Sequence, residues 1–231
     1  MVCCGVLLEF VLFSLLSPAA CAEIGNLKEI INFLQTTYGA GENQFAVAIN
    51  VPAEKCSAGV TPDQNFLPDD GARKVIDAMD GTAKVYKGQR LIGAKPKPIS
   101  NNPNINYHSE YLLLIQSNPP ATSPDDPLMM QLLNTNPDGC VVFYTYNSPC
   151  VKTCSTPNKR YSIIPALDMF TDHKGPKAFV FGQVWKHDVN KAQWETNMRA
   201  VNGKVPLYRC NNAGCTLCVD NNDKINTQCT Y

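Results

Sequence analysis

The sequence predicts an α/β domain in which a mixed sheet is covered by helices on both faces. The main observation is that segments with the apolar period of a helix alternate along the chain with short β-branched and aromatic runs. A second is that about 209 residues follow an N-terminal apolar leader, which suits one domain with an adequate core.

Residues 1–22 are predicted to be a secretory signal peptide, which leaves 23–231 as the mature domain. The apolar run at 6–16 is shorter than the roughly 20 residues that a membrane-spanning helix needs. The small-x-small pattern at 20–22 is one that signal peptidase accepts. The alternative is a buried N-terminal helix. No later stretch is long and apolar enough to span a membrane, so we expect a secreted protein without stable membrane association.

The first part of the mature chain predicts one helix and two strands. Apolar residues recur at helical spacing over 24–37, which predicts an amphipathic helix. The run 45–49 predicts a strand. Clusters of Pro, Asp and Gly make 52–80 loop-like, with a helical turn at 71–79. The run 84–91 predicts a second strand, which we expect to pair with the first as a hairpin.

The middle of the chain carries the strongest predicted strand. Residues 95–106 are rich in Asn and Pro and predict a loop. A helix is predicted to follow from Tyr107 through the apolar run that ends at Ile115. After a Pro-rich loop at 118–127, a short helix is predicted at 128–133. The β-branched and aromatic run 140–146 then predicts a strand.

The last part of the chain continues the alternation of helices and strands. Residues 164–170 and 188–201 predict helices, and 178–185 predicts a strand between them. Residues 205–209 predict a last strand. It opens a Cys-rich tail at about 205–231.

Charge and cysteine content narrow the classes of function. The chain has 20 basic and 20 acidic residues, and loss of the leader changes the net charge to about +1. This balance argues against a strong phosphate-binding stripe, because nucleic-acid binders usually carry a basic excess. Eight of the 11 cysteines lie outside the leader, an even number that indicates disulfides in a secreted protein. If Cys150 and Cys154 bind metal, six remain whose pairing the sequence does not determine: Cys56, Cys140, Cys210, Cys215, Cys218 and Cys229.

Two short motifs carry the chemistry of the chain. The first is the H-x-E triplet that begins at His108 and ends at Glu110, and the second is Pro149 followed by Cys150 and Cys154. In zinc deaminases, an H-x-E motif and a later P-C-x-x-C motif supply one His and two Cys to Zn²⁺, while the Glu moves protons without binding the metal. The two motifs therefore predict a hydrolytic deaminase.

Local structure explains why these residue types suit that chemistry. Ser148 is a favoured helix N-cap and Pro149 a favoured first helical residue, so a helix is predicted to begin here. Cys150 would lie in its first turn, and Cys154 four residues on would share its face. With His108 they give three ligands of a tetrahedral zinc, whose fourth position takes water. Zinc lowers the pKa of such a water toward roughly 7, and Glu110 is placed to take up its proton.

Two other readings of the motifs stay open from the sequence. In a secreted protein, the P-C-x3-C segment is also the pattern of two disulfide cysteines, which would give a disulfide-stabilised domain without metal. A secreted binding or decoy protein that keeps the fold without turnover is the other alternative. The presence of Glu110 argues against this second alternative.

With the strand that leads into Ser148 and a further strand that ends at Trp185, these motifs resemble those of the AID/APOBEC-type zinc deaminases. The leader and the surplus cysteines make the chain most similar to the secreted novel AID/APOBEC-like deaminases. The resemblance covers roughly 24–201. It implies a cytidine-deaminase-like three-layer α/β/α sandwich with a mixed, about five-stranded sheet, bound zinc, conversion of cytidine to uridine and a role in host immunity.

Carried over residue by residue, the resemblance makes His108, Cys150 and Cys154 the zinc ligands and Glu110 the proton shuttle. The chain departs from the family pattern in four ways, one of which is Asn147 where the family usually has Trp. The other three concern spacing and helix continuity. Three residues separate the two cysteines where two are commoner, 38 residues separate Glu110 from Pro149, and Pro157 interrupts the segment where the family has a continuous helix.

Four further residues are candidates for substrate binding. Tyr146 and Trp185 could stack on a base, with a role in the core or at the rim as the alternative. Asn147 occupies the position where the family usually has Trp, and Asn106 precedes the His motif. The expected substrate is single-stranded DNA or RNA, whose base must be unstacked to reach the pocket, or a free nucleoside. No obligate protein partner is inferred, and the oligomeric state stays open.

Overall fold

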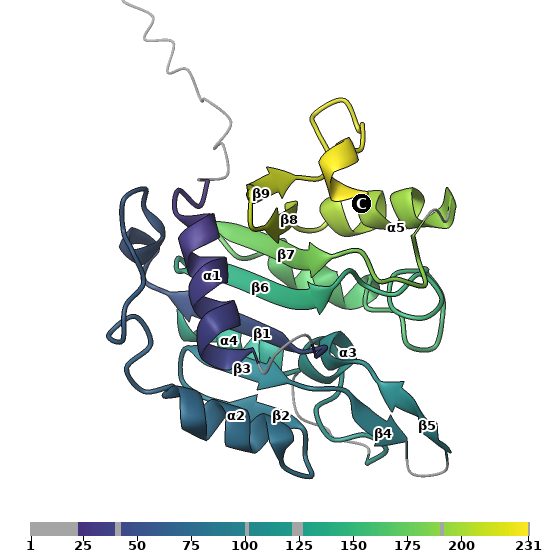
Figure 1. Cartoon of the computed structure of the whole chain (residues 1–231), viewed down its shortest axis with the longest axis horizontal. Helices are drawn as coiled ribbons and strands as arrows, with labels where there is room; N and C mark the ends of the chain where they lie inside the picture. Colours follow the sequence, from purple (N-terminus) through teal and green to yellow (C-terminus); the bar gives the residue numbers. More distant parts are fainter. Residues whose placement is uncertain (1–22, 40–42, 100–101, 122–126, 190–191, 231) are drawn as a thin grey trace, which may run out of the picture.

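A computed structural model of the chain describes residues 23–39, 43–99, 102–121, 127–189 and 192–230 (Figure 1). The predicted signal peptide lies outside these residues and stays a prediction. Within the described ranges, no helix has the length and apolar character needed to cross a membrane.

A seven-stranded mixed sheet forms the middle of the fold, in the order β2-β3-β1-β6-β7-β8-β9 (Figure 1). Its strands are β1 (Ala46–Val51), β2 (Val85–Lys87), β3 (Leu91–Ala94), β6 (Cys140–Asn147), β7 (Lys177–Gln183), β8 (Leu207–Asn211) and β9 (Gly214–Leu217). β6, β7 and β8 run parallel, and β1 is antiparallel to both of its neighbours. The expected count of about five strands matches the five inner strands, because β2 and β9 are hairpin arms added at the two edges.

Helices cover both faces of this sheet, as the sequence predicts. The first face carries α1 (Leu27–Tyr38) and α2 (Ala72–Asp80), and the second carries α3 (Ser109–Leu114), α4 (Leu128–Thr135), α5 (Ala192–Asn202) and the 3₁₀ helix η2 (Pro165–Phe170). Alternate residues of a strand point to opposite faces. Val47 and Ile49 of β1 accordingly pack in the cluster with α1 and α2, whereas Ala46 and Ala48 pack in the cluster with the other helices. The fold is therefore a three-layer α/β/α sandwich.

Two predictions for the first half of the chain are wrong in detail. The single strand expected at 84–91 is two strands, because the Gly88 amide donates to the Leu91 carbonyl (2.8 Å) and turns the chain between β2 and β3. Only β3 of this pair reaches β1. A side chain at Gly88 would collide with the Asp70 carboxylate, so the turn requires glycine.

The Asn- and Pro-rich stretch expected to be a loop is instead a separate two-stranded hairpin. It consists of β4 (Lys97–Ile99) and β5 (Asn102–Tyr107). Asn and Pro are rare in strands, and the register is interrupted between Pro98 and Ile99, so the sequence pattern resembles a loop. The hairpin delivers the chain directly to His108.

The remaining elements lie close to their predicted positions. Both long predicted strands of the second half, now β6 and β7, and the helices now named α4 and α5 are confirmed within a few residues. The helix expected at 164–170 is the 3₁₀ helix η2. The Cys-rich tail adds β9 and a 3₁₀ helix, η3 (Thr227–Cys229), which the sequence did not predict.

Three disulfides use all six cysteines whose pairing the sequence left open. They are Cys56–Cys140, Cys210–Cys215 and Cys218–Cys229. The first joins the 3₁₀ helix η1 (Ala53–Cys56) to the start of β6, and the other two lie in the tail. Among the described cysteines, this leaves Cys150 and Cys154 as free and buried thiols.

Candidate active site

His108 and Glu110 lie at the junction between the β4–β5 hairpin and α3. β5 ends at Tyr107, and His108 is the extended N-cap residue of α3. Glu110 follows in the first turn of this helix and is 2% exposed. The helix predicted after His108 is confirmed, and it places the imidazole and the carboxylate at the same corner of the fold.

Cys150 and Cys154 follow the end of β6, but the helix predicted from Ser148 is wrong. The segment forms turns, closed by a bond from the Cys154 amide to the Cys150 carbonyl (2.9 Å). The Ser155 hydroxyl donates to the carbonyl of Pro149 (3.1 Å), which competes with the backbone bonds of a helix. Pro157 lacks the amide hydrogen that would extend the turn into a helix.

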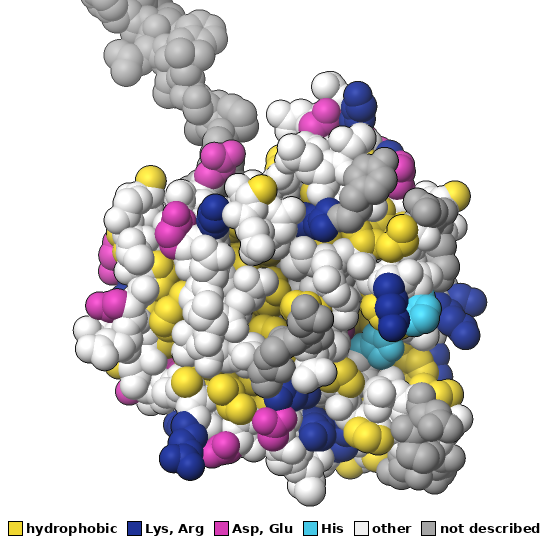
Figure 2. Space-filling model, viewed as in Figure 1, with side chains coloured by type: hydrophobic (Ala, Val, Ile, Leu, Met, Phe, Trp, Pro, Cys, Tyr) yellow, Lys and Arg dark blue, Asp and Glu magenta, His cyan; other side chains and the backbone are white. Residues whose placement is uncertain are grey.

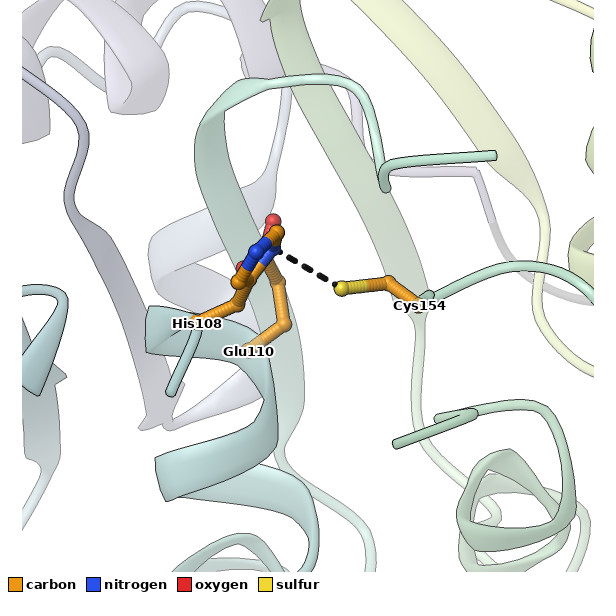
Figure 3. Close-up of side chains that lie close together, drawn as sticks. All are labelled: His108, Glu110 and Cys154. Atoms are coloured by element: carbon orange, nitrogen blue, oxygen red, sulfur yellow. Dashed lines mark hydrogen bonds between the residues drawn. The ribbon is translucent and has the colours of Figure 1, made fainter. Parts of the chain in front are cut away.

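The thiol of Cys154 points at the imidazole of His108, and its Sγ lies 3.1 Å from Nδ1 (Figure 3). In a tetrahedral zinc site, ligand bonds of about 2.0 and 2.3 Å put nitrogen and sulfur about 3.5 Å apart. One ligand atom each from His108, Glu110 and Cys154 lies within 4.8 Å of the other two. Cys150 is not part of this closest group, but it lines a cavity that His108 and Glu110 also line.

The electrostatic environment of Cys154 disfavours a thiolate in the absence of a cation. Burial, and then the negative charge of Glu110, raise the pKa of the Cys154 thiol well above its usual value. Cys154 is 1% exposed, so water cannot offset this effect. A divalent metal ion would supply the missing positive charge, and metal ligation deprotonates a coordinating thiol.

Hydrogen bonds hold the carboxylate of Glu110 in place. Thr145 donates its hydroxyl to Oε1 (2.8 Å), and Gln44 donates its amide to the same oxygen (3.4 Å). Oε2 accepts one longer bond, from the Ser109 hydroxyl (3.4 Å). The carboxylate is therefore anchored mainly through one oxygen, which leaves the other less engaged.

A cavity of about 160 Å³ opens beside these groups. It is lined by Gln44, Pro96, Asn106, His108, Glu110, Asn147, Ser148, Cys150 and Trp185. Three of the four predicted substrate residues, Asn106, Asn147 and Trp185, are thus brought together with the motif residues. The fourth, Tyr146, does not line this cavity. Successive residues of β6 alternate between faces, and Tyr146 packs against the cluster beneath α1 instead.

Trp185 lines the cavity and contacts two histidines. Its ring meets His108 edge-on at a centroid distance of 6.4 Å and His187 at 4.8 Å. His187 and the neighbouring Lys186 are exposed. Figure 2 shows histidine side chains together with Lys or Arg near one edge of the viewed face, whereas acidic and basic groups are interspersed elsewhere on it.

Two residues of the site were missed by sequence reasoning. Gln44 precedes β1, whose start lies beside the end of β6, and its Oε1 accepts from the backbone amide of Asn147 (2.9 Å). Asp188 is fully buried and accepts from the backbone amide of Val151 (2.7 Å), so it holds the turn that carries both cysteines. The available signals were a polar residue two positions before the start of β1 and an acid five positions after the end of β7.

One family of known proteins matches the chain. The family model described as Secreted Novel AID/APOBEC-like Deaminase 1 matches residues 24–231, which is nearly the whole chain. No curated protein and no solved structure matches it.

Proposed function

We propose that this chain, which belongs to the Secreted Novel AID/APOBEC-like Deaminase 1 family, is a zinc-dependent hydrolytic deaminase that converts cytidine to uridine. The observation that carries the proposal is the use of the cysteines. Of the eight cysteines among the described residues, six are paired in disulfides and two, Cys150 and Cys154, are thiols. Cys154 lies against His108 and Glu110, and Cys150 lines the cavity that His108 and Glu110 also line.

The residues present fit a zinc ion. His108, Cys150 and Cys154 would hold it, since one imidazole and two thiolates are a donor set that zinc prefers and that leaves one position for catalysis. The contact between Cys154 and His108, and the cation that the Cys154 thiolate requires, both support this assignment. When bound, zinc acts as a Lewis acid and provides a nucleophile from water at neutral pH.

Glu110 is the group that moves protons in this proposal. Its Oε2 accepts only one long hydrogen bond among the bonds of the described residues, and it belongs to a side chain that lines the cavity. The carboxylate would accept a proton as water adds to the amino-bearing carbon of cytosine. It would pass this proton to the ring nitrogen. It would then take the proton of the newly added hydroxyl and pass it to the amino group, which leaves as ammonia when the carbon–nitrogen bond breaks.

The cavity residues suggest how the base is held. The amides of Asn106 and Asn147 line the cavity and can bond to polar edges of a nucleoside, while Trp185 offers an aromatic surface at the mouth. The substrate we propose is a cytidine, either in single-stranded DNA or RNA or as a free nucleoside. A base in a strand would have to be unstacked to enter.

The proposed setting is extracellular, with a role in host immunity. The family is described as secreted, and three disulfides are consistent with an oxidising compartment. Removal of residues 1–22 as a signal peptide is part of this proposal.

The substitution Glu110→Gln tests the mechanism. It keeps the shape of the side chain but removes the proton acceptor, so we expect deamination to fall by about 10²–10⁴-fold while zinc stays bound. Glu195→Gln, at a half-exposed position on α5, is the matched control and should leave turnover unchanged. Turnover at the wild-type rate in Glu110→Gln would contradict the proposal.

A further inference from the structure

A second and larger depression lies at the same end of the strands as the candidate active site. It has a volume of about 640 Å³. We call it the edge groove, and it is lined by Gln35, Tyr146, Gly182, Gln183, Arg209 and 210–213. None of these residues lines the active-site cavity.

The position of the edge groove follows from the sheet topology. β6, β7 and β8 are parallel, so their carboxyl ends lie side by side. In open α/β sheets, ligands bind in crevices outside the carboxyl ends of the strands. The two depressions are neighbours there, because the side-chain amide of Gln183, which lines the groove, donates to the side-chain Oδ1 of Asn147, which lines the active-site cavity (2.9 Å). One pair of side chains therefore separates them.

Arg209 gives the edge groove a positive charge. It is half-buried, and among the described residues its guanidinium donates to two backbone carbonyls, those of Gly182 (3.4 Å) and Gln228 (2.8 Å). No carboxylate of the described residues forms an ion pair with it. A partly desolvated guanidinium without an acidic partner favours binding of an anion, and its planar fork suits phosphate.

The other lining residues suit a base more than a simple anion. Tyr146 is half-buried and lines the groove, and the exposed Asn211 and Asn212 offer amides. Gln35 is held in place by its bond to the Tyr144 hydroxyl (2.7 Å). An aromatic ring, several amides and one arginine are the groups that bind a nucleobase together with its phosphate.

We propose that the edge groove is a nucleotide-binding site, in which Arg209 pairs with the phosphate and Tyr146 stacks on the base. The nucleotide has two sources that the structure makes equally accessible. It is either the neighbour of the target cytidine in a strand, a reading that rests on the proposed deaminase function, or a free mononucleotide bound independently of catalysis.

The first experiment measures binding without turnover. AMP and adenosine, neither of which offers a cytosine, are titrated calorimetrically into the zinc-loaded Glu110→Gln protein and into the same protein with Arg209→Met. Because a hydrogen bond to a charged group contributes strongly, we expect AMP to bind at least about tenfold more weakly after Arg209→Met and to lose its advantage over adenosine. Arg73→Met, which removes the same charge from an exposed site on α2, should change neither affinity.

The second experiment identifies the source of the nucleotide. A trinucleotide with one cytosine is titrated into the same variants over a range of salt concentrations. If the groove holds a neighbouring nucleotide, the trinucleotide binds more tightly than AMP. The logarithm of its binding constant falls with the logarithm of the salt concentration, and Arg209→Met makes this slope shallower by about 0.7. If the groove holds a free mononucleotide, the trinucleotide has no advantage over AMP.

Tyr146→Leu provides an independent variant in case Arg209→Met does not fold. It removes stacking without changing charge, so we expect AMP and adenosine both to bind about tenfold more weakly. The proposal would be overturned if AMP and the trinucleotide bind to Arg209→Met and to Tyr146→Leu as tightly as they bind to Arg73→Met. Since no arm requires turnover, this result is distinct from a failure of the deaminase proposal.

Discussion

At the scale of single residues, Gln44 connects most of the groups around the carboxylate of Glu110, the proposed proton shuttle. Its amide nitrogen donates to the hydroxyls of Thr145 (2.9 Å) and Ser109 (3.1 Å), and both of these hydroxyls donate to Glu110. Its amide oxygen accepts from the side chain of Asn147 (2.8 Å), which lines the cavity. We therefore infer that Gln44 is a positioning residue, which holds Glu110 and the cavity wall together.

The substitution Gln44→Met tests this role. It keeps the length of the side chain but removes every hydrogen bond, so we expect kcat to fall by about tenfold or more with one zinc retained per chain. The free energy of unfolding should fall by about 1–3 kcal/mol because several buried partners lose their bonds. Gln64→Met, at an exposed position, is the matched control. A kcat equal to wild type in Gln44→Met would contradict the assignment.

The same residues explain which parts of the site the sequence predicts. His108 and Glu110 lie two positions apart, and Cys150 and Cys154 four, so their chemistry is visible in short motifs. Gln44 reaches the site only because the start of β1 lies beside the end of β6, and a sequence does not give that register. Tyr146 was placed in the site because it adjoins the motif, but the alternation of a strand directs it to the other face.

At the scale of elements, the turn after β6 has to present both cysteines without the support of a helix. Hydrogen bonds to residues outside the turn hold its backbone instead. Asp188 accepts the Val151 amide (2.7 Å), and the Ser148 hydroxyl accepts bonds from the Trp185 amide and the Trp194 indole (both 3.2 Å). Such indirect supports orient the ligands of a metal.

Removal of one support should weaken the metal site without changing its ligands. We expect Asp188→Ala to lower the affinity for zinc by about 10–100-fold, because the turn loses the buried acceptor of its backbone amide. Asp188→Asn keeps an acceptor oxygen and should lose less. Asp172→Ala, at an exposed position, serves as control. Competition with a chelator measures the affinity, and equal affinities in Asp188→Ala and wild type would contradict the role of Asp188.

Elements differ in how well the sequence predicts them, for a physical reason. The buried strands β6 and β7 are β-branched and aromatic because they pack on both faces, so their composition identifies them. The edge strand β2 is short, and the β4–β5 hairpin contains Asn and Pro. Their strand structure comes from backbone pairing with a neighbour, which leaves little trace in composition.

At the scale of the whole molecule, the disulfides divide into one long-range link and two local ones. Cys56–Cys140 joins positions 84 residues apart and ties the segment after β1 to the central strand β6. Cys210–Cys215 spans only 5 residues between the paired strands β8 and β9. None of the three touches the metal motifs, so we expect them to support stability and not metal binding.

The two kinds of disulfide should differ in their contribution to stability. Loop-closure entropy predicts about 4.5 kcal/mol for Cys56–Cys140 and about 2 kcal/mol for Cys210–Cys215. We therefore expect the paired substitution Cys56→Ser and Cys140→Ser to lower the free energy of unfolding in urea more than the pair Cys210→Ser and Cys215→Ser. Zinc content should be unchanged in the folded forms of both. An equal or reversed order of stability would contradict this account.

The central claim is that His108, Cys150 and Cys154 form a zinc site, and the metal content of the purified protein tests it most directly. We predict one zinc per chain, lost in His108→Ala and retained in His187→Ala, with both cysteines free to react with a thiol reagent once the metal is removed. A protein without zinc, in which Cys150 and Cys154 are joined in a disulfide, would contradict the claim and with it the proposed deaminase activity.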